Sequence, residues 1–191
     1  MHRTIAPIAI VVTVAAVSSM AQAGDVRPSQ QSVLILRILA YDRNLKSRAG
    51  NSVTIALLYK SGDAESEGVL KSVGTAIEEV SKGANVAGLP VRVTRIPYTD
   101  ANAFEAKAAA EKASAVYVCP GLNDAVKAIS GVTRRRSILS IAANEPYVTG
   151  GLGIGIVMRS DKPTVVVNLP ATKAEGADLD AGLLRVAEVM R

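Results

Sequence analysis

Between residues 53 and 142, short apolar runs alternate with longer segments whose apolar side chains recur at helical spacing. This alternation constrains the fold most, because a strand, a helix and a second strand in succession form a crossover between parallel strands. The predicted strands are residues 53–59, 91–98, 115–119 and 138–142, separated by helices over residues 61–83, residues 101–113 and a segment that begins at Asn123 or Asp124. We therefore predict an α/β fold, a three-layer sandwich with helices on both faces of a mostly parallel sheet.

The two ends of the chain depart from this alternation. Residues 29–46 carry apolar side chains without a helix breaker and predict an N-terminal helix. Residues 154–158 and 164–167 are β-branched runs joined by a short charged segment, which is typical of an antiparallel hairpin, and we place this hairpin on one edge of the sheet. Asn168 then caps a short helix, and residues 180–190 are predicted as the last helix.

Residues 1–23 have the composition of a secretory signal peptide. Arg3 gives a positive start, and residues 8–17 are almost entirely apolar. Residues 21–23 are Ala-Gln-Ala, in which two small residues flank a polar one, as is typical of a signal-peptide cleavage site. A retained N-terminal anchor is the alternative, but the apolar run is shorter than the roughly 20 residues that a membrane span needs. We expect cleavage after Ala23, a single domain over residues 24–191, and a periplasmic protein that does not insert into the membrane.

Two residue types that carry much enzyme chemistry are nearly absent. The chain has one histidine, His2, which leaves with the leader, and one cysteine, Cys119, at the end of an apolar strand. The mature chain therefore lacks histidine bases and histidine metal sites, cannot form an internal disulfide, and has no cysteine near the cleavage site for lipid attachment. We predict that the protein is not an enzyme and binds no cofactor and no metal.

The charge balance argues against nucleic-acid binding. The whole chain has 22 Lys and Arg against 17 Asp and Glu, and loss of Arg3 leaves a net charge of +4. A single basic run, residues 134–136, is present, and the chain has no Trp and only one Phe to stack on bases. We therefore expect a protein or small-molecule partner.

Two groups of residues are candidates for binding. Parallel sheets bind ligands at the carboxyl ends of their strands, where Tyr98, Asn123 and Asn144 follow predicted strands and could hold a small ligand. The second group surrounds the strand at residues 138–142 and could contact a protein partner; it contains Arg134, Arg135, Arg136, Tyr147, Gly150 and Gly151. The structural alternative is that the arginines complement the helix dipole and that Tyr147 covers the sheet edge. Residues 150–155 are glycine-rich, but they precede a strand, whereas a dinucleotide-binding loop follows one.

The C-terminal third carries a family resemblance. Gly150-Gly151, the strand that ends in Asn168, the Glu175-Gly176 pair and the Leu183-Leu184 helix occur in the order found in YfiR/HmsC-like periplasmic proteins, which this sequence resembles. The resemblance implies a repressor that binds the sensor part of an inner-membrane diguanylate cyclase and lowers the output of cyclic-di-GMP.

These observations together predict a non-catalytic periplasmic regulator of an inner-membrane sensor protein, of the diguanylate cyclase or histidine kinase type. Preferential binding to the inactive sensor conformation would shift its population toward that state. A periplasmic small-ligand-binding protein, related to one lobe of a transport receptor, is the alternative. We also predict a homodimer, because the N-terminal helix and the hairpin both offer apolar surface.

Overall fold

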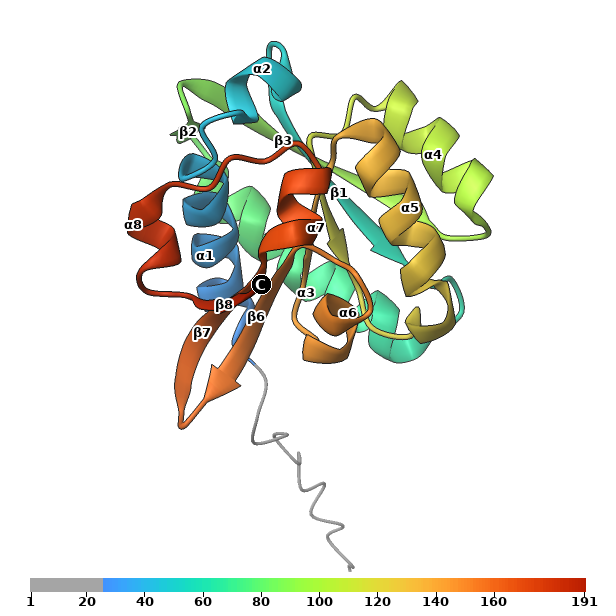
Figure 1. The fold of residues 1–191 in the computed structure, drawn as a ribbon. Helices are drawn as coiled ribbons and strands as arrows, with labels where there is room; N and C mark the ends of the chain where they lie inside the picture. Colours follow the sequence, from blue (N-terminus) through green and yellow to red (C-terminus); the bar gives the residue numbers. More distant parts are fainter. Residues whose placement is uncertain (1–25) are drawn as a thin grey trace, which may run out of the picture.

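The computed structural model describes residues 26–191, shown in Figure 1. The predicted signal peptide lies outside the described residues. In chain order, the helices and strands are α1 (Pro28–Ala40), α2 (Leu45–Ala49), β1 (Val53–Tyr59), α3 (Ala64–Ser81), β2 (Asn85–Val86), β3 (Leu89–Pro97), α4 (Ala101–Ala110), β4 (Ala115–Val118), η1 (Asn123–Ala125), α5 (Val126–Arg136), β5 (Leu139–Ala142), α6 (Glu145–Thr149), β6 (Ile154–Arg159), β7 (Lys162–Asn168), α7 (Leu169–Ala174), α8 (Ala181–Leu184) and β8 (Glu188–Met190).

The strands form one sheet in the order β2-β3-β1-β4-β5-β6-β7-β8. Strands β3, β1, β4, β5 and β6 are parallel to their neighbours in this series, whereas β6 and β7 form an antiparallel hairpin. The predicted fold class is confirmed, namely a mostly parallel α/β sheet with an antiparallel hairpin near one edge. The three-residue strand β8 pairs with β7 in parallel and is the outermost strand on that side.

The central strand β1 packs on both faces because neighbouring side chains of a strand point to opposite sides. Ile55 and Leu57 belong to the apolar cluster under α1 and α3, whereas Ala56 and Leu58 belong to the cluster under α4, α5 and α6. Figure 1 shows α4 and α5 together on one side of the sheet and α1 on the other. The chain therefore has the predicted three layers.

The prediction of one N-terminal helix over residues 29–46 is wrong, because α1 ends at Ala40 and a separate helix α2 begins at Leu45. The break is made by Asp42, whose Oδ1 accepts the N–H of Asn44 at 3.0 Å and the N–H of Asp178 at 2.9 Å. Its Oδ2 pairs with the guanidinium of Arg48, and both side chains are buried. A carboxylate that captures backbone donors in this way competes with continued helix formation.

The predicted last helix over residues 180–190 is also wrong. Helix α8 ends at Leu184, and residues 188–190 form strand β8 against β7. The open edge of β7 offers backbone groups that the last residues of the chain pair with, and this pairing overrides the helix propensity of the segment.

Side-chain caps begin helices α3 and α7, and the one at Asn168 was predicted. Asp63 accepts the N–H of Ser66, and Asn168 accepts the N–H of Ala171. Asn123 begins the 3-10 helix η1, which has no side-chain cap. Within residues 26–191, no helix is long and apolar enough to cross a membrane.

Candidate functional site

The three predicted ligand-binding residues at the strand ends do not converge on one site. Tyr98 lines an open hollow of about 230 Å³ that also contains Lys60 and Asp124. Asn144 lines a different cavity of about 100 Å³, and Asn123 is exposed and lines neither of these two spaces. Burial and the nearby Asp100 raise the pKa of Tyr98, so this phenol is neutral at physiological pH.

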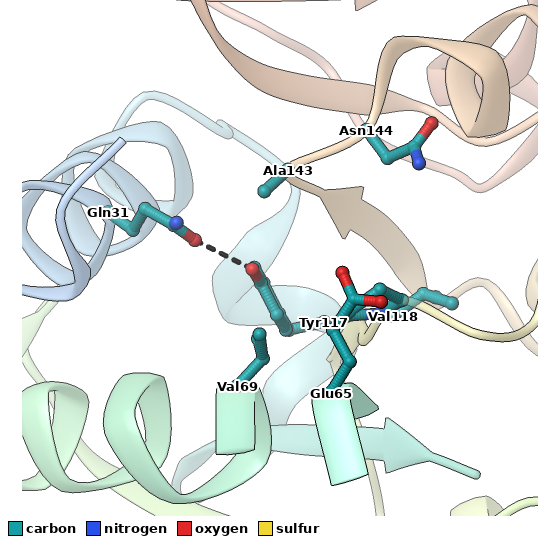
Figure 2. Close-up of a pocket in the computed structure, with 8 residues that line it drawn as sticks. Gln31, Glu65, Val69, Tyr117, Val118, Ala143 and Asn144 are labelled. Atoms are coloured by element: carbon teal, nitrogen blue, oxygen red, sulfur yellow. Dashed lines mark hydrogen bonds between the residues drawn. The ribbon is translucent and has the colours of Figure 1, made fainter. Parts of the chain in front are cut away.

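The cavity beside Asn144 lies between α1, the start of α3, and the ends of β4 and β5 (Figure 2). Its floor is held by a buried hydrogen bond of 2.6 Å, in which the Tyr117 hydroxyl donates to Oε1 of Gln31. The Asn144 Oδ1 atom is buried without a hydrogen-bond partner among the described residues.

Of the predicted protein-binding residues, the structure brings Arg134 and Gly151 into direct contact, and all but Tyr147 reach the surface. The guanidinium of Arg134, in the last turn of α5, donates to the carbonyl of Gly151 at 3.2 Å. Arg135 forms an ion pair of 2.6 Å with Glu105 of α4, which lowers the pKa of this carboxyl, and Arg136 is exposed. We call the surface made by Arg134, Arg135, Arg136, Gly150 and Gly151 the arginine corner.

Tyr147 is the exception, because it is buried, with 1% of its surface exposed. Helix α6 turns the ring into the cluster under α4 and α5, where its hydroxyl accepts the N–H of Leu122 at 2.8 Å. The placement of Tyr147 on the contact surface was therefore incorrect. This hydrogen bond fixes α6, which leads into Gly150 of the arginine corner, against the loop at residue 122.

Sequence reasoning missed a buried carboxylate directly behind the arginine corner. Glu175, at the end of α7, is fully buried, and its Oε1 lies 2.7 Å from the Thr133 hydroxyl and 2.5 Å from the Ser140 hydroxyl. Its Oε2 accepts the backbone N–H of Ser140 at 3.0 Å. The Ser140 hydroxyl in turn accepts the N–H of Gly153 at 2.7 Å. We call Glu175, Thr133, Ser140 and Gly153 the Glu175 cluster.

Burial raises the pKa of Glu175 from its usual 4.5 to about 6, although the hydrogen bonds from Ser140 and Thr133 and the charge of Arg134 act in the opposite direction. Desolvation therefore outweighs the favourable contacts. A sequence signal for this cluster was present, since Ser140 interrupts an otherwise apolar strand and Glu175 stands in a short helix of small residues. Neither segment alone predicts that Ser140 and Glu175, 35 residues apart, form hydrogen bonds.

Other reactive groups lie away from this corner. Cys119 is a free thiol whose pKa burial raises to about 12, as expected for a small apolar residue in a core strand. Within residues 26–191, no group of His, Cys, Asp and Glu residues is arranged to hold a metal ion.

Comparison with protein families gives a match of residues 30–188 to the model of the YfiR/HmsC-like family. No curated protein matches the sequence.

Solved structures share the fold at low sequence identity. A conserved domain protein from Vibrio cholerae has 14% identity and a TM-score of 0.59, covering 87% of this chain and 61% of that chain. An ABC domain in complex with L-Trp from Streptococcus pneumonia has 16% identity and a TM-score of 0.56, covering 80% and 60%. A substrate-binding protein with adhesive properties from Clostridium difficile, in a ligand-free open form, has 18% identity and a TM-score of 0.53, covering 78% and 57%. This chain thus spans about three fifths of these proteins, and the likeness is one of fold.

Proposed function

Because the chain belongs to the YfiR/HmsC-like family, we propose that it binds the extracytoplasmic part of an inner-membrane signalling protein and lowers the output of that protein. The family match over residues 30–188 carries this proposal, since it covers nearly all of the described domain. At family level these proteins are periplasmic regulators of diguanylate cyclase signalling. In this proposal the chain itself is non-catalytic and acts by shifting the conformational population of its partner.

The arginine corner is the surface that we assign to this contact. Arg134 and Arg136 are exposed, and neither forms an ion pair with another described residue, so both are available to acidic groups of a partner. Arginine can bind a carboxylate through two parallel hydrogen bonds, and it is enriched among the residues that dominate binding energy. We therefore propose a partner surface that is acidic where it meets the end of α5.

The test is a triple substitution, R134S, R135S and R136S, in the mature protein. Exposed substitutions usually change stability little, so the variant should fold, but it should no longer capture the sensor from solubilised inner membranes. The matched control removes three exposed cations elsewhere, through K46S, K71S and K82S. Equal capture by wild type, control and triple variant, with the captured protein identified by mass spectrometry, would overturn the assignment of this surface.

Binding of a small ligand is the second candidate function, favoured by the cavity in Figure 2, which is lined by Asn144, a residue whose Oδ1 atom is buried without a hydrogen-bond partner among the described residues. A ligand that donates a hydrogen bond there should raise the melting temperature. The probes are free amino acids, because one structure of similar fold holds L-Trp. This function replaces the first if Asn144→Ala abolishes such a rise and the wild-type protein captures no membrane protein.

Two further parts of the proposal concern the state of the mature protein. We propose cleavage after Ala23, and N-terminal sequencing of the exported protein should begin at Gly24.

We also propose a homodimer through the apolar groove between α1 and β7, where Val33 is 42% exposed and Pro163 forms the other wall. Light scattering at tens of micromolar should give twice the monomer mass, and a monomer would contradict the dimer.

A further inference from the structure

The carboxyl group of Glu175 is unusual because no cation lies within ion-pair distance of it among residues 26–191. An ionised carboxylate in such surroundings is stabilised mainly by its hydrogen bonds, with a smaller contribution from the charge of Arg134. Its partners are two hydroxyl groups and one backbone N–H, from Thr133 and Ser140.

The hydrogen-bond inventory has a place for one additional proton. The Thr133 hydroxyl has a single proton and also lies 3.1 Å from the carbonyl of Ser130. When Thr133 donates to that carbonyl, its oxygen can accept a hydrogen bond from a protonated Glu175. The Ser140 hydroxyl accepts the N–H of Gly153 and still donates its own proton to Oε1 of Glu175. The cluster is therefore fully bonded with a neutral carboxyl group.

The Glu175 cluster is mechanically joined to the arginine corner at two points. Thr133 directly precedes Arg134 in α5, and Gly153 belongs to the glycine turn, residues 150–153, whose Gly151 carbonyl accepts the Arg134 guanidinium. The contact is close, because a Cβ atom on Gly153 would lie 2.6 Å from Oε2 of Glu175. A change at this carboxyl group thus acts directly on the turn that holds Arg134.

We propose that protonation of Glu175 locks the glycine turn beneath Arg134, so that the protein presents its arginine corner in the binding form at acidic pH and loosens it as the pH rises. This inference rests on the proposed function, since it assigns regulation to the same surface. Ionisation places a negative charge in a buried cluster, and opening of the glycine turn lets water reach that charge.

The charged groups around the cluster define the direction of this response. From α5, Arg134 favours the ionised form, but less strongly than burial opposes it. From α2, Arg48 packs near Gly176 but is paired with Asp42, while β5 and the glycine turn present the neutral residues Ser140 and Gly153. With a pKa of about 6 in the closed form and 4.5 in the open form, the opening constant should be about eight times larger at pH 7.5 than at pH 5.

Hydrogen exchange of the mature protein tests this directly. After correction for intrinsic exchange, the Gly153 and Ser140 amides of the wild type should open about eightfold more at pH 7.5 than at pH 5. Glu175→Gln keeps the size of the neutral acid, an acceptor for the Ser140 N–H and a donor toward Thr133, and it should show no such change. The control Glu79→Gln alters an exposed carboxylate on α3 and should behave like the wild type. Equal pH dependence in the wild type and Glu175→Gln would overturn the proposal.

A second measurement tests the proposal even if Glu175→Gln fails to fold. In wild-type protein labelled with ¹³C at the Glu carboxyl carbons, one resonance should titrate near pH 6, and Thr133→Val should move its midpoint upward by removing a donor to the carboxylate. A spectrum in which every Glu titrates near its usual pH contradicts the inference.

Capture of the membrane partner at pH 5 and pH 7.5 separates this inference from the proposed function. Wild-type capture should weaken at pH 7.5 by up to about eightfold, whereas capture by Glu175→Gln should be equal at both values. Capture that does not depend on pH overturns the inference and leaves the proposed function intact. Absence of capture at every pH, with pH-dependent exchange, overturns the proposed function instead.

Discussion

Two regions of the domain each bury a carboxylate, and they compensate the charge differently. At the junction of α1 and α2, Asp42 is paired with the buried guanidinium of Arg48 and accepts two backbone N–H groups. Behind the arginine corner, Glu175 has two hydroxyl groups and one backbone N–H but no ion-pair partner. A buried ion pair stabilises the charged form of both partners, whereas a carboxylate among neutral donors can exchange its charge for a proton.

The comparison separates a structural role from a responsive one. Asp42 joins the start of the domain to residue 178, and the loss of its charge would leave the Arg48 guanidinium bonded to backbone carbonyls but without a counter-charge. Glu175 joins α5, β5 and α7 in a cluster that remains hydrogen-bonded after protonation. The four predictions below test this distinction.

The largest effect is expected for Asp42→Asn, which keeps a hydrogen-bond acceptor but leaves Arg48 buried without a counter-charge. The free energy of unfolding should fall by about 3 to 5 kcal/mol, the range for breaking a buried ion pair. Urea denaturation measures this loss. The double variant Asp42→Asn, Arg48→Met removes both charges and should recover much of the stability, and a cost below about 1 kcal/mol for the single variant would remove the distinction.

A smaller loss is expected for Gly153→Ala, which places a methyl group against Glu175 and the backbone of Ser140. The new Cβ atom would lie 2.6 Å from Oε2 of Glu175 and 3.3 Å from the Ser140 carbonyl oxygen. Overpacking of this kind costs about 1 to 3 kcal/mol. Gly68→Ala in α3, where a Cβ atom meets nothing within 4 Å, is the matched control and should stabilise the protein by up to about 1 kcal/mol.

The third effect is the pH dependence that Glu175 contributes to folding stability. Its pKa is about 6 in the folded protein and 4.5 in the unfolded chain, so the folded state binds the proton more tightly. The resulting stability is fully present below pH 4.5 and is lost as the pH rises through 6, a change of up to about 2 kcal/mol. The stability difference between wild type and Glu175→Gln, measured at pH 4.5 and 7.5, should shift by this amount, and a constant difference would contradict it.

The smallest effect is expected at Cys119, a buried titratable group that does not ionise in the physiological range. Burial raises its pKa to about 12, so the folded protein should hold a neutral thiol throughout that range. A thiol reagent at pH 8 should react only after unfolding in urea, since the thiolate is the nucleophile. Rapid reaction in the folded state would show that this strand end opens to solvent.

The sequence predicted the parts of the fold that local patterns determine. The buried run of β1, the helix cap at Asn168, and the β6–β7 hairpin each follow from neighbouring residues. The break after α1 was missed because Asp42 makes its decisive contacts with Arg48 and the remote Asp178. Strand β8 was missed for a related reason, since its partner is the open edge of β7.

The candidate site also contains contacts that the local sequence predicts and contacts that depend on long-range packing. Arg134 and Gly151 flank one strand, so their proximity was predictable, and a hydrogen bond joins them. The inward turn of Tyr147 depends on the packing of α6 against the loop at Leu122, which no local pattern encodes. Glu175 was missed as part of the site because its hydrogen-bond partners Thr133 and Ser140 lie 42 and 35 residues earlier in the chain.

The hydrogen bond from the Asp178 N–H to Asp42 has a consequence for the order of folding. It spans 136 residues, so a chain synthesised from its N-terminus to residue 177 already contains strands β1 to β7 but lacks this donor. Contacts of such long range form late, because the intervening chain must first be ordered. The α1–α2 junction can therefore be completed only after the C-terminal segment has been synthesised. In a nascent or truncated chain that ends before residue 178, the Asp42 carboxylate lacks this N–H donor.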